Sequence, residues 1–105
     1  MSAGAANPLR GEAELRVGGE SFRLRPTFAA LVAAENELGP LFALTERAAA
    51  GGLGLAETAA LLWHCIDARP EGLSREAVGE AVAGAGLVAV TPVLRAVLMQ
   101  ILQGR

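Results

Sequence analysis

The sequence predicts a mostly α domain of the α+β class, with an N-terminal β-hairpin followed by about five short helices in one compact domain. Apolar and charged residues alternate on both sides of a Gly-Gly pair near the start, which is typical of a hairpin. After residue 27, apolar residues recur at helical spacing between helix-capping and helix-ending residues. The length of 105 residues leaves room for one hydrophobic core. We therefore expect a disordered tail at 1–10 and a single domain at 11–105.

The hairpin is predicted over residues 12–25, which read EAELRV, Gly-Gly, ESFRLR. The glycine pair favours a two-residue primed turn between the strands. An isolated two-stranded hairpin is only marginally stable in water, so its apolar face must lie on helices or on a strand of another subunit. Its open edge could pair with a partner. The expected apolar face comprises Ala13, Leu15, Val17, Phe22 and Leu24, and the expected charged face comprises Glu12, Glu14, Arg16, Arg23 and Arg25.

Two helices are expected directly after the hairpin. Thr27 is a favourable N-cap for residues 28–38, and Gly39 ends that helix. Pro40 then fits the first turn of a second short helix, residues 41–50, which the glycines at 51–52 end.

The third helix is expected from about Leu55 to Asp67. Its core stripe is formed by Leu55, Ala59, Leu62 and Ile66, with Leu61 and Cys65 on one flank.

Two more helices complete the prediction. Ser74 caps the fourth, whose glycines Gly79 and Gly84 lower its stability. Thr91 and Pro92 open the fifth, which ends near Gly104. The expected inward residues are Ala77, Val78, Ala81 and Ala85 on the fourth helix, and Leu94, Val97, Leu98 and Ile101 on the fifth.

Composition argues against several classes of protein. The net charge is −2 and all nine basic residues are arginines, a bias that we attribute to a GC-rich genome, so nucleic acid is not an expected partner. The N-terminal residues do not resemble a secretory signal. The longest apolar stretch, 87–102, is too short and too interrupted to span a membrane. A single cysteine excludes an internal disulfide, and we expect a bacterial cytoplasmic protein.

Catalytic, cofactor and metal sites are not expected. His64 and Cys65 are adjacent, but neighbours on a helix point about 100° apart and cannot form a nucleophile and base pair. We expect Cys65 in the core and His64 on the polar face with Glu57. The chain has one histidine, so a metal site would need unusual ligands. The glycine-rich stretches at 51–54 and 84–86 lack a lysine and follow no predicted strand, unlike a phosphate-binding loop.

Two residues on the earlier helices are candidates for partner binding. Glu35 falls in the same arc as Phe28, Leu31 and Val32. A carboxylate there would form an ion pair with Arg25, Arg23 or Arg47, reach solvent at the helix end, or bind a partner. Trp63, the only tryptophan, either covers the rim of the core or anchors a partner.

The last helix is more apolar than one buried face requires, so part of it is expected to contact another chain. Met99 falls outside the predicted buried arc. The candidate partner-binding residues are Arg25, Glu35, Trp63, Val90, Val93, Val97, Met99 and Leu102.

Most of the chain from Arg10 onward resembles a known family. The hairpin and first helix read RGEAELRVGGESFRLRPTFAALVAAENELG, of which LRPTFAAL and the glutamate before the helix-ending glycine are the most specific part. The later segments LAETAALLWHC and LSREAVGEAVAGAGL and a hydrophobic last helix also match. The sequence thus resembles the gene transfer agent and phage tail assembly chaperone family, which is also labelled phage tail tube protein.

The resemblance implies a non-enzymatic protein of phage-like tail assembly, without cofactors. In the first hypothesis it is a chaperone that keeps the tape measure protein soluble while tube subunits polymerise. In the second it is a structural tube subunit, which would make it part of the particle. A third hypothesis, a small hydrolase built on His64, Cys65 and Glu35, has no support from helical geometry. Expected partners are the tape measure protein, tail tube subunits, or a second copy bound through the last helix or the hairpin edge.

Overall fold

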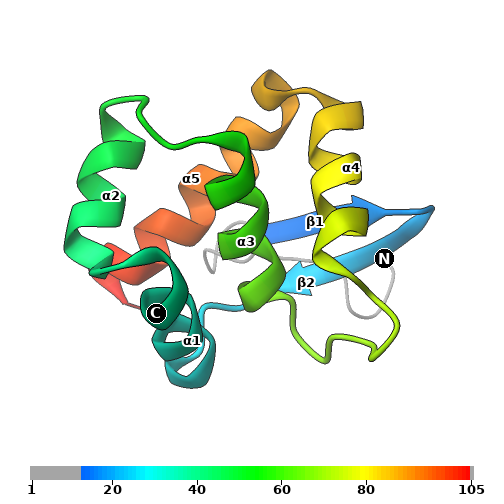
Figure 1. Cartoon of the computed structure of the whole chain (residues 1–105), viewed down its shortest axis with the longest axis horizontal. Coiled ribbons are helices and arrows are strands. Elements are labelled where there is room, and N and C mark those ends of the chain that lie inside the picture. The colour runs from blue at the N-terminus through cyan, green and yellow to red at the C-terminus, as the bar shows by residue number, and fades with distance from the viewer. Residues whose placement is uncertain (1–12, 105) are drawn as a thin grey trace.

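The computed structural model describes residues 13–104, and in this part of the chain five helices pack around a two-stranded hairpin (Figure 1). This confirms the predicted class and the order of the elements. The predicted tail at 1–10 and Glu12 lie outside the described residues. The elements are β1 (Ala13–Val17), β2 (Glu20–Leu24), α1 (Phe28–Leu38), α2 (Leu41–Ala49), α3 (Leu55–Cys65), α4 (Arg75–Ala85) and α5 (Leu87–Gln103).

The hairpin has the predicted turn and register. Gly18 and Gly19 have φ angles of 58° and 85°, as the primed turn requires of both central residues. Leu15 lies opposite Phe22 in the antiparallel pair. The predicted apolar face is confirmed, because its members are buried apart from Phe22, which packs against the core from its edge.

A segment after α3 adds to the hairpin. Ile66 forms an isolated bridge with Leu24, the Arg25 N–H donates to the Cys65 carbonyl at 2.7 Å, and the Asp67 N–H donates to the Arg23 carbonyl at 2.9 Å. The prediction that α3 continues to Asp67 is therefore wrong, because the chain leaves the helix to pair with the outer edge of β2.

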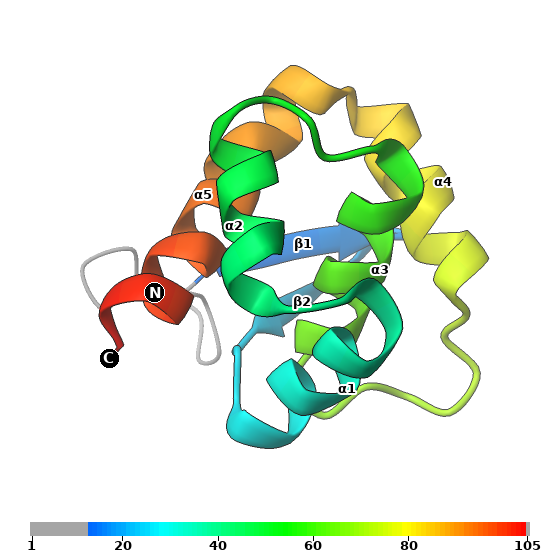
Figure 2. The same cartoon turned by 60° about the vertical axis from the view of Figure 1, so that its left-hand side comes forward.

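The core lies between the hairpin and the helices. In Figure 1, α3 and α4 lie in front of the strands, and α1 packs against α3. Figure 2 shows α2 next to α5, on the side of the molecule away from α4. Cys65 is in the core, as predicted. The fully buried large side chains are Leu24, Leu44, Leu61, Leu62, Val78, Val82 and Val97.

Side-chain caps fix the starts of α1 and α4 as predicted. The Thr27 hydroxyl oxygen accepts from the Ala30 N–H at 3.2 Å, and the Ser74 hydroxyl oxygen accepts from the Ala77 N–H at 3.0 Å. Gly39 ends α1 with a φ of 94°. These signals are local in sequence, which is why they could be predicted.

The predicted start of α5 is wrong. The helix begins at Leu87, because Gly86 with a φ of 91° lets the chain turn directly from α4 into α5. Thr91 and Pro92 therefore lie inside the helix. The Thr91 hydroxyl donates to the Leu87 carbonyl at 2.7 Å, and a proline this close to the helix start interrupts only the first turns. The predicted end at Gly104 is confirmed.

Two predicted core faces need correction. Leu55 is exposed, because it is the first residue of α3 and lies beyond the packed part of the helix. Ala85 is exposed at the end of α4, whereas Val82 is fully buried and was not predicted. The remaining predicted residues of these two faces are buried or half-buried.

Candidate partner-binding surface

An apolar groove lies between α1, α2 and the last turn of α5. Its volume is about 270 Å³. All but two of its lining side chains are apolar. The lining residues, which define the apolar groove below, are Leu31, Glu35, Leu41, Phe42, Thr45, Ile101 and Leu102.

Large apolar side chains are exposed in and beside this groove. Phe42 and Leu102 line it and are 81% and 58% exposed. Phe28 is 84% exposed and lies one helical turn from Leu31 and Val32 on the same face of α1. Exposed large apolar side chains that gather on one part of a surface are typical of a site that binds another protein.

The expected buried face of α1 is wrong. Phe28 and Val32 were expected in the inward arc with Glu35, but both are exposed, and Ala34 is the fully buried residue of α1. Eight of the eleven residues of α1 are apolar, including its first seven, so the sequence FAALVAAENEL has little polar contrast between its faces. Periodicity alone therefore could not choose the buried side.

Glu35 borders the apolar groove and caps the next helix. Its Oε2 accepts a hydrogen bond from the Leu41 N–H at 3.1 Å. This bond satisfies one of the free N–H groups at the start of α2, because Pro40 has no side chain that could cap the helix. Of the alternatives expected for Glu35, the ion pair is not found among residues 13–104, and the carboxylate is exposed at the helix end. Its proposed partners pair elsewhere, Arg25 with Asp67 at 3.6 Å and Arg47 with Glu57 at 2.6 Å.

Arg23, the third proposed partner of Glu35, lies on β2, and its Nε is buried without a hydrogen-bond partner among the described residues. The exposed Glu35 carboxylate therefore faces solvent at the groove rather than a buried cation.

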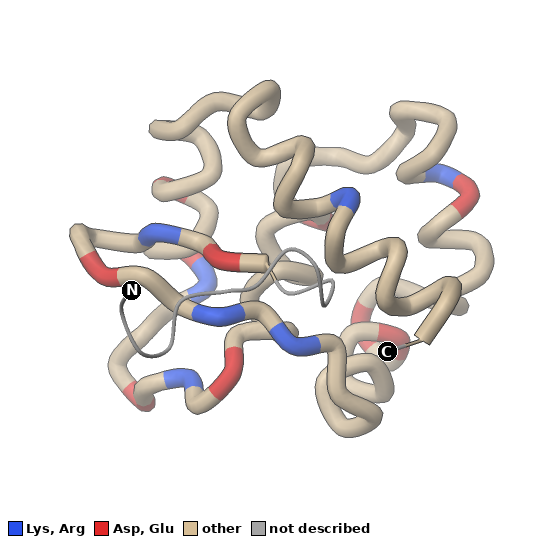
Figure 3. The backbone as a smooth tube through the Cα atoms, turned by 180° about the vertical axis from the view of Figure 1, so that it is seen from behind, with Lys and Arg blue, Asp and Glu red and all other residues tan. Residues whose placement is uncertain are grey.

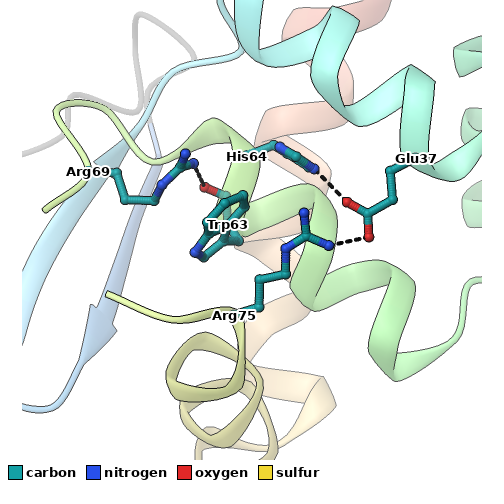
Figure 4. Close-up of polar contacts among 5 residues, drawn as sticks. All are labelled: Glu37, Trp63, His64, Arg69 and Arg75. Carbon is teal, nitrogen blue, oxygen red and sulfur yellow. Dashed lines mark hydrogen bonds and ion pairs between the residues drawn. The ribbon is translucent and has the colours of Figure 1, made fainter. Parts of the chain in front are cut away.

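A polar cluster fixes α1 against α3 and the start of α4 (Figure 4). The Glu37 carboxylate accepts from His64 Nε2 at 2.8 Å and also from Arg75. The hydrogen bond from His64, followed by that from Arg75, holds the pKa of Glu37 below its ordinary value against an opposing effect of burial. His64 was expected at the surface, but its side chain is only 8% exposed, because Glu37 and Trp63 enclose it.

Trp63 belongs to the same cluster and is engaged within the chain. Its Nε1–H donates to the Leu73 carbonyl at 3.2 Å. The Arg69 guanidinium lies 3.5 Å from the ring centroid and that of Arg75 lies 4.6 Å away, which are cation–π distances. Trp63 therefore holds the loop before α4 in place, at the half-buried rim of the core.

The candidate residues of the last helix are divided between core and surface. Val90 and Val97 are buried in the core of this chain, and Val93 is half-buried and packs against that core. Met99 and Leu102 are exposed. Figure 3 shows how little charge α5 carries, with Arg95 as its single charged residue. These two exposed residues lie at the C-terminal end of α5, beside the apolar groove, and Leu87 and Val88 are exposed in its first turn.

Two other hollows are larger but less apolar in character. One, of about 490 Å³, lies between α3 and α4 over alanines and is bordered by Glu76 and Glu80. The other, of about 370 Å³, lies beside the Arg25–Asp67 pair and is bordered by Arg69. Neither is lined by a Phe or Trp side chain.

The residues of a hydrolase site are not assembled. Burial raises the pKa of the Cys65 thiol to about 12, so it stays protonated and is a poor nucleophile. His64 is held by Glu37, and Glu35 caps α2 instead. Within residues 13–104, no group of three or more His, Cys, Asp or Glu could hold a metal ion. None of the described helices is long and apolar enough to cross a membrane.

Comparison with known proteins gives a match to a family model. A family model described as phage tail tube protein, GTA-gp10, matches residues 10–104. No curated protein and no solved structure matches the chain. The matched segment contains the hairpin, the helices and the whole apolar groove.

Proposed function

The chain belongs to the family described as phage tail tube protein, GTA-gp10, and from this we propose that it is a non-enzymatic assembly chaperone that binds the tape measure protein. Membership of the family makes it a phage-like tail protein. The proposal adds a role during assembly, in which this small domain covers apolar helical segments of the tape measure protein until tube subunits enclose them. Such work would take place in the cytoplasm of a bacterial host.

One observation carries the proposal. Phe28 and Phe42 are more than 80% exposed on two neighbouring helices, and Phe42 borders the apolar groove. Aromatic side chains, phenylalanine included, are enriched in protein interfaces relative to the rest of the surface. An apolar helix laid along the groove would remove both rings from water and insert its own side chains between α1, α2 and α5.

The groove also suits a reversible contact. It is shallow and its volume of about 270 Å³ admits a few side chains rather than a whole helix. A chaperone must release its client when the tube forms, so a contact based on a few anchors fits this role better than a deep pocket.

The second candidate function is a structural tube subunit. The description of the family and the free edge of the hairpin favour it. However, the sheet in residues 13–104 has two strands, and closing a ring through sheets requires a larger sheet in each subunit. We therefore place the chaperone first.

Co-expression tests the chaperone role. We expect the tape measure protein of the same gene cluster to be more soluble with this protein than without it. The double variant Phe28→Ser, Phe42→Ser should remove most of that gain, whereas Val88→Ser, which changes an equally exposed residue outside the groove, should retain it. Equal solubility of the tape measure protein with and without this chain would reject the proposal.

Purified particles separate the two candidate functions. A chaperone should be absent from them or present at trace level, and a tube subunit should be among their most abundant proteins. Quantitative mass spectrometry of purified particles, together with electron microscopy of labelled protein, measures this directly.

A further inference from the structure

The two edges of the hairpin differ in what pairs with them. The Arg23 carbonyl in β2 accepts from the Asp67 N–H, and the N–H of Arg25, directly after β2, donates to the carbonyl of Cys65, the last residue of α3, so these backbone groups point away from β1. The pairing register places Arg23 opposite Glu14 and Ser21 opposite Arg16. In an antiparallel pair, the N–H and C=O groups of two opposite residues either both point toward the partner strand or both point away from it. The backbone groups of Glu14 and Arg16 therefore point away from β2.

The outer edge of β1 is therefore the free edge. The residues after α3 close the outer edge of β2 at two positions, whereas the backbone groups of Glu14 and Arg16 make no hydrogen bond within residues 13–104. Figure 3 shows the hairpin on the near side of the molecule next to α5, with α3 and α4 behind it, and α4 and α5 contact β1. A free edge of this kind accepts another strand.

We propose that β1 pairs antiparallel with β1 of a second copy of this chain, about a two-fold axis at Leu15. This register places Glu14 of each copy opposite Arg16 of the other, as hydrogen-bonded pairs, which gives four backbone hydrogen bonds and two opposite-charge pairs.

Charge selects this register over its neighbours. A shift that centres the axis on Glu14 or Arg16 places two carboxylates or two guanidinium groups directly opposite each other, which destabilises a pair of strands. A shift by one residue would turn the backbone groups of one copy away from the other. The alternation of one acid and one base around Leu15 is thus self-complementary, as a two-fold interface requires.

The resulting sheet has four strands in the order β2, β1, β1, β2. Since the axis is perpendicular to the sheet, the helices of both copies lie on the same side, over the apolar face that includes Leu15. The contact is small, so we expect weak, concentration-dependent association that tightens at low salt. This inference concerns a surface separate from the apolar groove and does not depend on the chaperone role.

Charge reversal tests the register with the full chain. Glu14→Arg and Arg16→Glu each place like charges together in a dimer of the variant, and we expect sedimentation velocity to give about tenfold weaker association for each. An equimolar mixture of the two variants places two arginines of one copy opposite two glutamates of the other, so association should return toward that of the wild type. A wild-type chain that is monomeric up to about 1 mM, or a mixture no stronger than its components, would overturn the proposal.

Proline substitution tests which edge is used. Arg16→Pro removes an outward N–H from β1, and the matched variant Ser21→Pro removes an outward N–H from β2, directly opposite in the register. We expect Arg16→Pro to abolish association and Ser21→Pro to preserve it, with both variants folded by circular dichroism. Association that survives Arg16→Pro, or that is lost on Phe28→Ser, Phe42→Ser instead, would place the interface elsewhere and reject the β1 edge.

Discussion

Glu37 is the residue that connects most elements through a single side chain. It lies on α1 and accepts from His64 on α3 and from Arg75 on α4. Because these partners keep the pKa of Glu37 below its ordinary value, the ionised carboxylate is more stable in the folded chain than in the unfolded chain. Its contribution to stability is present above the unfolded pKa and is lost as the pH falls through the folded pKa.

The substitution Glu37→Gln tests this linkage. At pH 7 we expect a Tm about 2–4 °C below that of the wild type, a small effect because the pair is partly exposed. The difference should shrink as the pH falls below the ordinary pKa of a glutamate and then through the lower pKa of folded Glu37, because the wild-type carboxylate becomes protonated too. Thermal unfolding followed by circular dichroism between pH 3 and pH 7 measures both values.

A matched control is Glu80→Gln, which removes an exposed carboxylate from α4 outside this cluster. Its Tm should follow that of the wild type at every pH. A Tm difference for Glu37→Gln that is equal at pH 3 and pH 7 would show that packing, not charge, explains the effect.

The partners of Glu37 could not be predicted from the sequence. His64 and Arg75 follow it by 27 and 38 residues, and nothing local indicates which acid meets which base. Helical spacing predicts His64 on the polar face of α3. In the fold, α1 packs against α3, and Glu37 on α1 accepts a hydrogen bond from His64. The choice among the alternatives for Glu35 was left open for the same reason, since Arg25 pairs with Asp67 and Arg47 with Glu57.

At the scale of the element, α4 is the helix whose stability is easiest to change. Gly79 and Gly84 both lie within it, and each costs conformational entropy there. An added Cβ at Gly79 would meet only the Ala59 Cβ at 3.9 Å, an ordinary contact, and one at Gly84 would meet nothing within 4 Å. Both positions therefore have space for alanine.

We expect the double variant Gly79→Ala, Gly84→Ala to raise the free energy of unfolding by about 1–2 kcal/mol. Urea unfolding followed by circular dichroism gives this value directly. The control is Gly86→Ala at the end of the same helix. Its φ of 91° is unfavourable for alanine, so it should lower the stability although space is free around it. A loss of stability in the double variant would mean that α4 packs more tightly than these contacts indicate.

Element boundaries were predictable where one residue decides them. The Gly-Gly turn and the caps at Thr27 and Ser74 act within three residues of their partners. The start of α5 was not predictable from a single residue. Pro92 is typical of the first turn of a helix, and no local signal shows that the helix already begins after Gly86. The bridge from Ile66 to Leu24 joins distant segments and has no local signal.

At the scale of the whole molecule, the fold leaves more apolar surface than one small core can bury. Exposed large apolar side chains gather along α1, α2 and the end of α5, and a second set, Leu55, Leu87 and Val88, lies in the first turns of α3 and α5. A surplus of apolar surface is expected from the sequence, but there it is expected on the last helix. In the structure, α1 and α2 supply the two most exposed aromatic rings.

The last prediction concerns this surplus in the free protein. Native chain should bind the apolar dye anilinonaphthalene sulfonate and increase its fluorescence, because Phe28 and Phe42 offer exposed rings beside a groove of about 270 Å³. The variant Phe28→Ser, Phe42→Ser should lower the signal at least twofold. Its Tm should stay within a few degrees of the wild type, since residues exposed by more than 80% contribute little to the core. Val88→Ser, 89% exposed but outside the groove, should leave the fluorescence nearly unchanged. If Val88→Ser lowers the signal as much as the double variant does, the dye reports general exposure and the groove has no special affinity for apolar groups.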